Sequence, residues 1–130
     1  MGAGLASVNE RVEALRQRTF KFAIDILALC RKYSDAPEAR VVRYQLAKCG
    51  TSVGANYRAA CRSRSRAEFV SRMAVVLEEA DEAEYWLLVT AEAELLGKSI
   101  VGSLSREAGE LVGIFTASLV TARRRQGERL

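Results

Sequence analysis

The residues best suited to bind a ligand are arginines, and most of the relevant ones gather in two clusters. A guanidinium group presents N–H donors in a planar fork that matches the oxygens of a phosphate. One cluster lies where a predicted helix begins, and the positive end of a helix dipole also favours an anion. The clusters are Arg62, Arg64, Arg66 and Arg72, and Arg123, Arg124, Arg125 and Arg129. This pattern predicts contacts with phosphates and hence nucleic-acid binding.

Negative charge is concentrated elsewhere in the chain. Residues 78–94 contain seven Asp and Glu and no Lys or Arg, so that the rest of the chain carries +11 within a net charge of +4. An acidic partner is an alternative ligand for the arginines. Arg-rich tails are also often only solvated ends that complement the helix dipole. Self-association would strengthen binding, because each cluster would be repeated around a symmetry axis.

The sequence lacks the residues of most common catalytic sites. It has 130 residues and no histidine, which excludes Ser-His-Asp and Cys-His units and His-containing zinc sites. The acids of residues 78–94 crowd one predicted helix, whereas di-metal bundles use Glu-x-x-His ligands from facing helices. Neither GxxxxGK[ST] nor GxGxxG occurs. We therefore expect no catalytic residue, no cofactor and no metal site.

Three cysteines are widely spaced and form no CxxC pair. They are Cys30, Cys49 and Cys61. This spacing favours neither a disulfide framework nor a zinc knuckle, and we expect reduced, buried thiols. The N-terminus has no apolar signal region, and no apolar run approaches the roughly 20 residues of a membrane helix. We expect a bacterial cytoplasmic protein that does not enter a membrane.

The elements that must position the arginines are helices. The single proline and the Ala, Leu, Glu and Arg content favour helix almost everywhere. A capping box at residues 7–10, a start signal around Pro37 and a capping box from Ser65 to Glu68 divide the chain, and Gly97 is expected to end the third helix. The predicted helices span about 8–33, 37–60, 66–96 and 104–124, with a basic tail at 123–130.

These helices predict a single all-α domain covering residues 1–130. Short connections make neighbouring helices run in opposite directions, which favours an antiparallel up-down-up-down four-helix bundle. A helical solenoid is the competing arrangement, and no repeat period supports it. On the third helix, the predicted core face comprises Phe69, Met73, Val76, Leu77, Ala80, Leu87 and Ala91, with Glu84 near its middle.

Two helices carry a second apolar face that a lone bundle would leave in water. On the first helix Phe20, Ile24 and Leu27 point away from the core stripe, and on the third Val75, Trp86 and Val89 do so, with Glu79 and Glu82 beside them. Scattered surface apolar residues are the alternative interpretation. Large contiguous apolar patches usually mark interaction surfaces, so we expect these eight residues to form contacts between copies.

Polar residues fall on positions that the helical pattern predicts to be buried. Asn56 lies on the core seam of the second helix, and Glu84 lies on that of the third. A buried amide or carboxylate needs hydrogen-bond partners. The candidate partners are Ser52, Arg58 and Arg43, or Asn56 and Glu84 could bind each other. A catalytic role is the alternative, but no nucleophile or metal ligand set accompanies them. We predict a structural polar network of Ser52, Asn56 and Glu84.

Three segments in order resemble the bacterial 23S rRNA intervening-sequence proteins, a four-helix-bundle family. They are Ser52-Val53-Gly54-Ala55-Asn56, Arg64-Ser65-Arg66-Ala67-Glu68-Phe69 and Glu79-Ala80-Asp81-Glu82-Ala83-Glu84-Tyr85-Trp86-Leu87. With weaker helical patterns on either side, the likeness covers nearly the whole chain. Ala60 departs from the acidic or small pair that the family commonly has after the Asn segment.

The resemblance implies a closed, ring-like homopentamer of four-helix bundles with a central opening. A related branch comprises the accessory variability proteins of diversity-generating retroelements, which bind nucleic acid and a reverse transcriptase. We therefore predict a non-enzymatic homo-oligomer that binds RNA or a ribonucleoprotein through Arg62, Arg64, Arg66, Arg72, Arg123, Arg124 and Arg125. The alternative is a protein-protein adaptor, such as an accessory factor for a reverse transcriptase. An enzyme is the third hypothesis.

Overall fold

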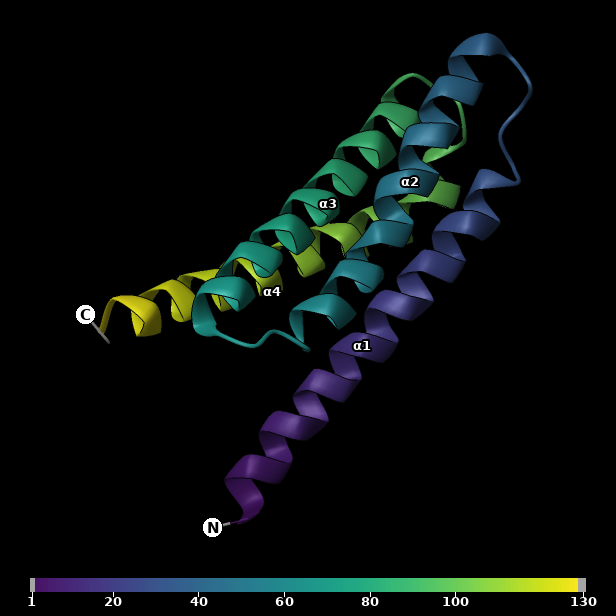
Figure 1. Ribbon diagram of the computed structural model, residues 1–130. Coiled ribbons are helices and arrows are strands. Elements are labelled where there is room, and N and C mark those ends of the chain that lie inside the picture. The colour runs from purple at the N-terminus through teal and green to yellow at the C-terminus, as the bar shows by residue number, and fades with distance from the viewer. Residues whose placement is uncertain (1, 129–130) are drawn as a thin grey trace.

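The computed structural model describes residues 2–128, with side chains from 8 to 127. Within these residues it contains four α-helices and no strand, which confirms the all-α, four-helix prediction (Figure 1). The helices are α1 (Gly2–Cys30), α2 (Pro37–Ala60), α3 (Arg66–Glu92) and α4 (Lys98–Glu128). The predicted bounds of α2 match the structure. The N-terminal turns of α1 and α4 lie outside the predicted helices.

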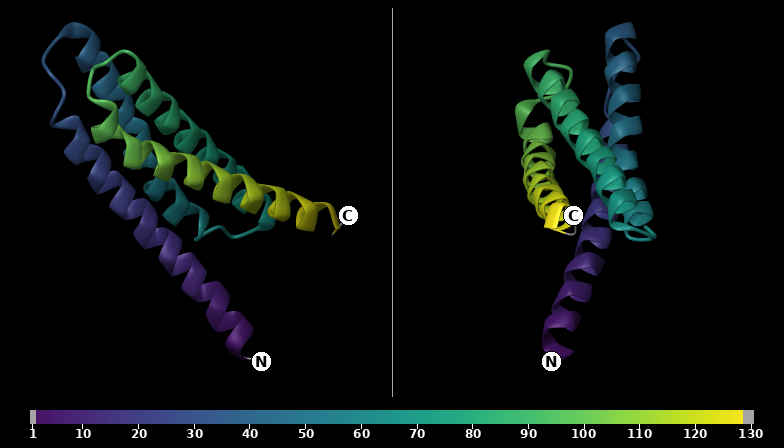
Figure 2. Two further views of the ribbon diagram at one scale, coloured as in Figure 1. Left: turned by 180° about the vertical axis from the view of Figure 1, so that it is seen from behind. Right: turned by 60° about the vertical axis from the view of Figure 1, so that its left-hand side comes forward.

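The helices pack in the order in which they follow one another. α2 packs against α1 and α3, α3 packs against α4, and the contact between α1 and α4 is the smallest among the helix pairs that touch. The colours of Figure 1 show that each short connection turns the chain back along the preceding helix. Both views of Figure 2 show the N-terminal half of α1 extending past the other three helices. One long edge of the bundle is therefore less closed than the others.

A single core of buried side chains lies among the four helices. All four helices contribute fully buried side chains, among them Phe22, Leu46, Met73 and Phe115. Thr19 is also buried, and its hydroxyl donates to the backbone oxygen of Leu15 at 2.8 Å. The polar atom is therefore satisfied within its own helix, as buried polar groups require.

Two glycines of α2 allow α1 to approach closely. A Cβ atom at Gly50 would lie 2.8 Å from Cγ2 of Ile26, and one at Gly54 would lie 3.2 Å from the backbone oxygen of Thr19. The first obstacle is a side chain, whereas the second is backbone that cannot rotate away. Gly54 therefore sets the distance between the two helices.

α3 ends at a residue other than the expected glycine. Glu94 takes the left-handed conformation, with φ 59°, and the N–H of Leu95 donates to the oxygen of Thr90 at 2.9 Å. These are the features of a Schellman cap, which usually uses glycine. Gly97 instead precedes α4, where its carbonyl accepts from the N–H groups of Ile100 and Val101. The predictions that α3 ends near Gly97 and that α4 begins near residue 104 are wrong.

The buried face of α3 is rotated relative to the predicted one. Ala83 and Thr90 are buried, whereas Glu84 and Ala91 are only partly so. Thr90 donates to the oxygen of Trp86 and accepts from the hydroxyl of Tyr33, since its own proton is already used. The hydroxyl pair explains why a polar position lies in the core, and the expected central place of Glu84 on this face is wrong.

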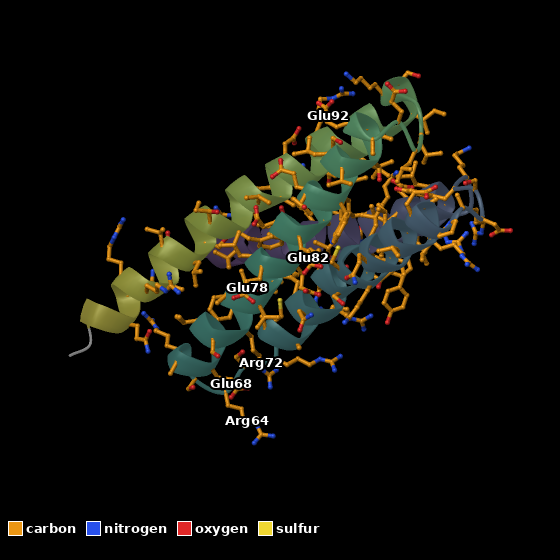
Figure 3. All side chains as sticks on the ribbon, turned by 90° about the horizontal axis from the view of Figure 1, so that it is seen from above. Arg64, Glu68, Arg72, Glu78, Glu82 and Glu92 are labelled. Atoms are coloured by element: carbon orange, nitrogen blue, oxygen red, sulfur yellow. The ribbon has the colours of Figure 1, made fainter. Side chains whose placement is uncertain are left out.

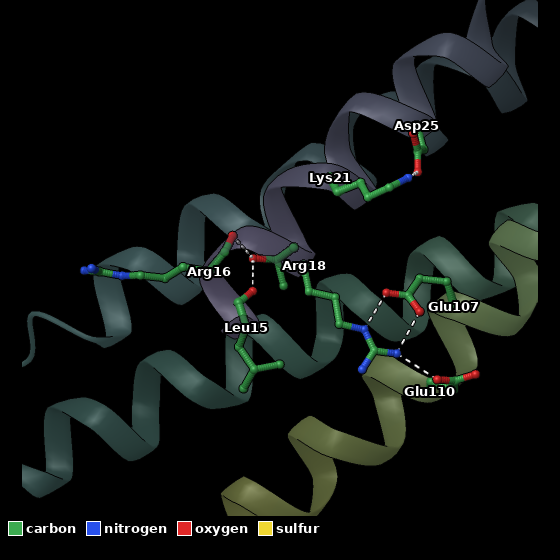
Figure 4. Close-up of polar contacts among 8 residues, drawn as sticks. Leu15, Arg16, Arg18, Lys21, Asp25, Glu107 and Glu110 are labelled. Carbon is green, nitrogen blue, oxygen red and sulfur yellow. Dashed lines mark hydrogen bonds and ion pairs between the residues drawn. The ribbon is translucent and has the colours of Figure 1, made fainter. Parts of the chain in front are cut away.

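Arg18 joins α1 to α4 where the two helices are close. Its Nε donates to Oε2 of Glu107 at 2.6 Å, and its Nη2 donates to Oε1 of Glu107 and of Glu110, each at 2.7 Å (Figure 4). The hydrogen bonds that Arg18 donates to Glu107 are the main cause that raises the pKa of Arg18 above its ordinary value. Bidentate pairs of this kind fix orientation as well as adding attraction.

Candidate nucleic-acid interface

The first arginine cluster lies on the connection between α2 and α3. Arg62, Arg64 and Arg66 are exposed there. The predicted capping box forms: the N–H of Glu68 donates to Oγ of Ser65 at 3.1 Å, and the N–H of Arg64 faces Oε2 of Glu68 at 3.5 Å. The cap fixes the direction in which the chain enters α3, and with it the positions of the flanking arginines.

Arg72 is engaged within the molecule. Its Nη1 donates to the oxygen of Ala59 at 2.7 Å, and its Nη2 pairs with Oε1 of Glu68 at 2.9 Å. The side chain therefore ties α3 to the end of α2. Arg72 contributes its charge to this end of the bundle, while two of its five N–H donors are already used.

The second arginine cluster lies at the same end of the bundle as the first. Arg123, Arg124 and Arg125 are exposed in the last turns of α4, and Arg129 lies outside the described residues. Figure 1 places the C-terminal end of α4 near the connection between α2 and α3. Arg125 lines a cavity together with Phe69 of α3. Residues that are distant in sequence thus form one positively charged end.

Two adjoining cavities form a groove at this end, which we call the basic groove. They have volumes of about 520 and 570 Å³ and share Val12, Tyr57 and Phe69 as lining residues. The full lining is Val8, Asn9, Arg11, Val12, Leu15, Tyr57, Ala60, Cys61, Ser63, Arg64, Ser65, Arg66, Phe69, Met73, Ile114, Ala117, Ser118, Thr121, Ala122 and Arg125. It includes four arginines and no carboxylate, so the groove attracts anions.

Sequence reasoning missed the contribution of α1 to this groove. Arg11 and Asn9 of α1 line the groove together with the apolar residues Val8 and Val12 of the same helix. Their places beside the core stripe of α1 were visible in the sequence. These positions did not predict a groove, because a closed bundle would have filled the space that the structure leaves open between α1 and α4.

Charge is segregated along α3. Figure 3 places Arg64, Glu68 and Arg72 at one end of the helix, and Glu78, Glu82 and Glu92 along the remainder toward its other end. Glu68 is paired with Arg72, whereas Glu78 and Glu92 are exposed. The acidic residues of the 78–94 stretch therefore lie away from the basic groove. They do not neutralise the arginines of the groove.

The residues predicted to join copies divide between exposed and half-buried. On α1, Phe20, Ile24 and Leu27 are 63, 50 and 38% exposed. On α3, Val75 is 41% exposed, Glu82 is exposed and Glu79 is partly buried. Trp86 and Val89 pack partly against the core, and the indole Nε1 of Trp86 donates to Oε2 of Glu82 at 3.2 Å. The apolar face of α3 is therefore smaller than that of α1.

Exposed apolar side chains also occur where the sequence analysis did not place them. Val41 and Tyr44 on α2 are 59 and 64% exposed. On α3, the ring of Tyr85 meets that of Trp86 edge-on with centroids 4.9 Å apart, and both Tyr85 and Leu88 are exposed. These residues enlarge the apolar surface that a single copy leaves in water.

The structure brings together two of the three residues of the predicted polar network. Nδ2 of Asn56 donates to the backbone oxygen of Ser52 at 2.8 Å, and Oγ of Ser52 donates to that of Lys48 at 2.7 Å. Glu84 lies on the other side of α3, where its Oε2 would be 2.8 Å from a Cβ atom at Gly109 of α4. The structure therefore does not bring Glu84 to Asn56.

The cysteine thiols are poor nucleophiles in this structure. All three are free, with Cys30 and Cys49 buried and Cys61 partly buried. Burial raises the pKa of Cys49 to about 12, with smaller contributions from Glu82 and Glu79, and burial also raises the pKa of Cys30. A thiol must ionise to react, so these two cysteines favour packing over catalysis.

The described residues form neither a metal site nor a membrane-spanning helix. In the part of the chain that the structure describes, no group of three or more Cys, Asp and Glu residues is placed to hold a metal ion. Among the described helices, none is long and apolar enough to cross a membrane.

The hydroxyl of Tyr57, which lines the groove, stays protonated. Burial is the main cause that raises the pKa of Tyr57, and Cys61 adds to it.

The chain resembles proteins that are already grouped into a family. Residues 13–117 match the family model of the 23S rRNA-intervening sequence protein. A solved structure of a protein of unknown function from the S23 ribosomal protein family of Bacteroides thetaiotaomicron is 28% identical. The match covers 80% of this chain and 96% of that chain, with a TM-score of 0.74. No curated protein matches the sequence. With the match spanning most of its length, the chain belongs to the 23S rRNA-intervening sequence protein family.

Proposed function

We propose that this protein is a non-enzymatic, cytoplasmic homo-oligomer that binds RNA or a ribonucleoprotein. In this proposal the four helices form an antiparallel up-down-up-down bundle. Copies of the bundle close into a ring, and five subunits is the number that the family resemblance implies. The phosphate contacts are assigned to Arg62, Arg64, Arg66, Arg72, Arg123, Arg124 and Arg125.

The observation that carries this proposal is the meeting of both arginine clusters at one end of the bundle. The cluster residues with described side chains are exposed, and apart from Arg72 none of them is paired with a described carboxylate. Phosphate binding needs cations that are not already neutralised. No observation of this kind supports an enzyme, since burial raises the pKa of Cys30 and of Cys49 and the sequence contains no histidine.

Association of copies is proposed to use two different surfaces of each subunit. One is formed by Phe20, Ile24 and Leu27 of α1, and the other by residues of α3. The residues on α3 are Val75, Glu79, Glu82, Trp86 and Val89. A contact between unlike surfaces produces a closed ring when the rotation between neighbours completes a circle. The exposure of Phe20 supports this choice, because burying a side chain of this size contributes about 1.5–3 kcal/mol.

RNA binding at increasing salt tests the proposal. The probe is a fluorescently labelled structured RNA, and the measurement is its affinity by anisotropy. The variant R64Q/R66Q/R124Q changes three exposed arginines at the basic end. The matched control R31Q/K32Q/R40Q removes the same charge at the opposite end, where α1 connects to α2.

Each phosphate contact contributes about 0.7–0.9 to the slope of log affinity against log salt. We therefore expect the slope to fall by about 2 or more in the first variant, and to change little in the control. Absent binding, binding insensitive to salt, or equal losses in both variants would reject the electrostatic interface.

A second candidate function is that of a protein-protein adaptor for a nucleic-acid enzyme such as a reverse transcriptase. The observation in its favour is an exposed apolar pair on α3, with Tyr85 and Leu88 57 and 52% exposed among acidic residues. Pull-down from extract treated with nuclease separates the two functions. A partner that survives nuclease and is lost in Y85S/L88S supports the adaptor, whereas loss of all partners with nuclease supports RNA binding.

A further inference from the structure

The basic groove contains more than phosphate binding requires. A cation on an ordinary helix surface is sufficient for a phosphate contact, as for Arg123 and Arg124. In the groove, however, Arg64 and Arg66 at one end and Arg11 and Arg125 at the other are separated by apolar side chains. A paired double helix turns its phosphates outward and keeps its bases stacked inside, so its bases would not contact the apolar side chains between the arginines. An unpaired strand exposes bases with flat apolar faces.

Two polar groups in the groove lack an internal role. Oγ of Ser63 is buried and has no hydrogen-bond partner among the described residues. The exposed side chain of Asn9 lines the same cavity of about 520 Å³, and an amide carries both donors and an acceptor. The edges of nucleobases consist of donors and acceptors. Because Oγ of Ser63 is buried, the exposed amide of Asn9 is the group that can read a base whose phosphate lies on Arg64 or Arg66.

An acidic amphipathic helix is the competing occupant. It would place carboxylates on the arginines and apolar side chains on the floor. Carboxylates only accept hydrogen bonds, so they would leave the amide oxygen of Asn9 without a donor, whereas a base edge carries both donors and acceptors. The described residues therefore favour an unpaired nucleic-acid strand over a helix.

We infer that the basic groove binds a single-stranded segment of RNA, with bases on its apolar floor and phosphates on Arg64 and Arg66 at one end and Arg11 and Arg125 at the other. This inference rests on the proposed RNA binding and adds the form of the RNA that is recognised. It assigns Asn9 to contacts with a base edge. Its floor is formed by Val12, Leu15, Phe69 and Ile114.

The test compares two probes with one sequence: an unstructured labelled RNA strand, and the same strand annealed to its complement. The groove variant is Ala117→Leu, which fills space at an exposed position of the groove lining without changing charge or helix propensity greatly. The matched control is Ala14→Leu, at an exposed position of α1 outside the groove. Asn9→Leu tests the base edge separately.

We expect the wild-type protein to prefer the single strand. Ala117→Leu and Asn9→Leu each weaken single-strand affinity about tenfold, the loss typical of one base contact, while duplex affinity and the salt slope stay unchanged. Ala14→Leu leaves both affinities unchanged. Equal affinity for strand and duplex, with equal salt slopes, overturns the inference and leaves RNA binding intact.

The remaining outcomes are also decisive. If neither RNA binds at any salt, the proposed function and this inference fail together. A synthetic acidic peptide with the sequence of residues 75–94 is the probe for the competing occupant. If that peptide binds to the wild-type protein and binds more weakly to the Ala117→Leu variant, while the RNAs show no strand preference, the groove is a protein-docking site. The inference is then wrong.

Discussion

Glu94 is a single residue that holds a backbone conformation unfavourable for its type. Its φ of 59° is in the left-handed region, where a Cβ atom crowds the neighbouring carbonyl and glycine is preferred. The conformation is maintained because it lets Leu95 donate to Thr90 and close the last turn of α3. The structure thus stores a small strain at the connection to α4.

We predict that Glu94→Gly stabilises the protein by about 0.5–1 kcal/mol, since glycine adopts this conformation without the steric cost. The free energy of unfolding in urea is the measurement. Glu92→Gly is the matched control, because Glu92 is the last residue of α3, and there the change should destabilise. A loss of stability in Glu94→Gly would show that the side chain, rather than the backbone, determines this cap.

Residue types alone predicted some local features and missed others. The capping box from Ser65 to Glu68 was predictable, because its hydrogen bond depends only on residues three apart. The cap at Glu94 was not, because glycine at position 97 gave the stronger local signal. The hydrogen bond between Tyr33 and Thr90 was also hidden, since it joins residues from distant parts of the chain.

At the scale of helices, the distance between α1 and α2 depends on Gly54. A Cβ atom there would meet the backbone of Thr19 at 3.2 Å. The obstacle is the main chain of α1, so the helices themselves must separate to admit a larger residue. Gly113 of α4 is a contrasting position, where nothing lies within 4 Å of an added Cβ atom.

We predict opposite effects of one substitution at these two glycines. Gly113→Ala should raise the free energy of unfolding by about 0.5–1 kcal/mol through helix propensity. Gly54→Ala should lower it by about 1–3 kcal/mol, because overpacking outweighs that gain. Thermal or urea unfolding of both variants is the measurement. Equal stabilisation of both would mean that the close approach of α1 and α2 is not required.

Helix number and most of the core stripes were predictable, but helix faces and ends were less so. The stripe of α1 follows from apolar residues three and four apart. On α3, small residues such as Ala80 and Ala83 weaken that pattern, and a path through Glu84 fitted the sequence equally well. Packing against α2 and α4 decides between the two faces, and sequence periodicity does not contain that information.

At the scale of the whole molecule, the edge between α1 and α4 remains the least closed. Arg18 ties the two helices together through Glu107 and Glu110, while the N-terminal half of α1 extends past the bundle. The basic groove results from this divergence. The arginine clusters could be recognised in the sequence, but their meeting with Arg11 and Asn9 could not, because it depends on where α1 leaves the bundle.

The proposed association depends on the large apolar side chains that a single copy leaves exposed to water. The exposed side chains include Phe20, Ile24, Leu27, Val41 and Tyr44, on two helices that pack against each other. Large apolar patches are rare on proteins that act alone. Association of copies would cover such a surface and repeat the basic end around the ring.

The native mass of the purified, RNA-free protein, measured by light scattering across a concentration series, tests this claim most directly. We predict a defined particle several times heavier than the 14.3 kDa subunit, which Phe20→Glu reduces because it places a charge in the contact. Val120→Glu, at an exposed position of α4 outside the proposed contacts, should leave the mass unchanged. A mass of one subunit at every concentration would contradict the account.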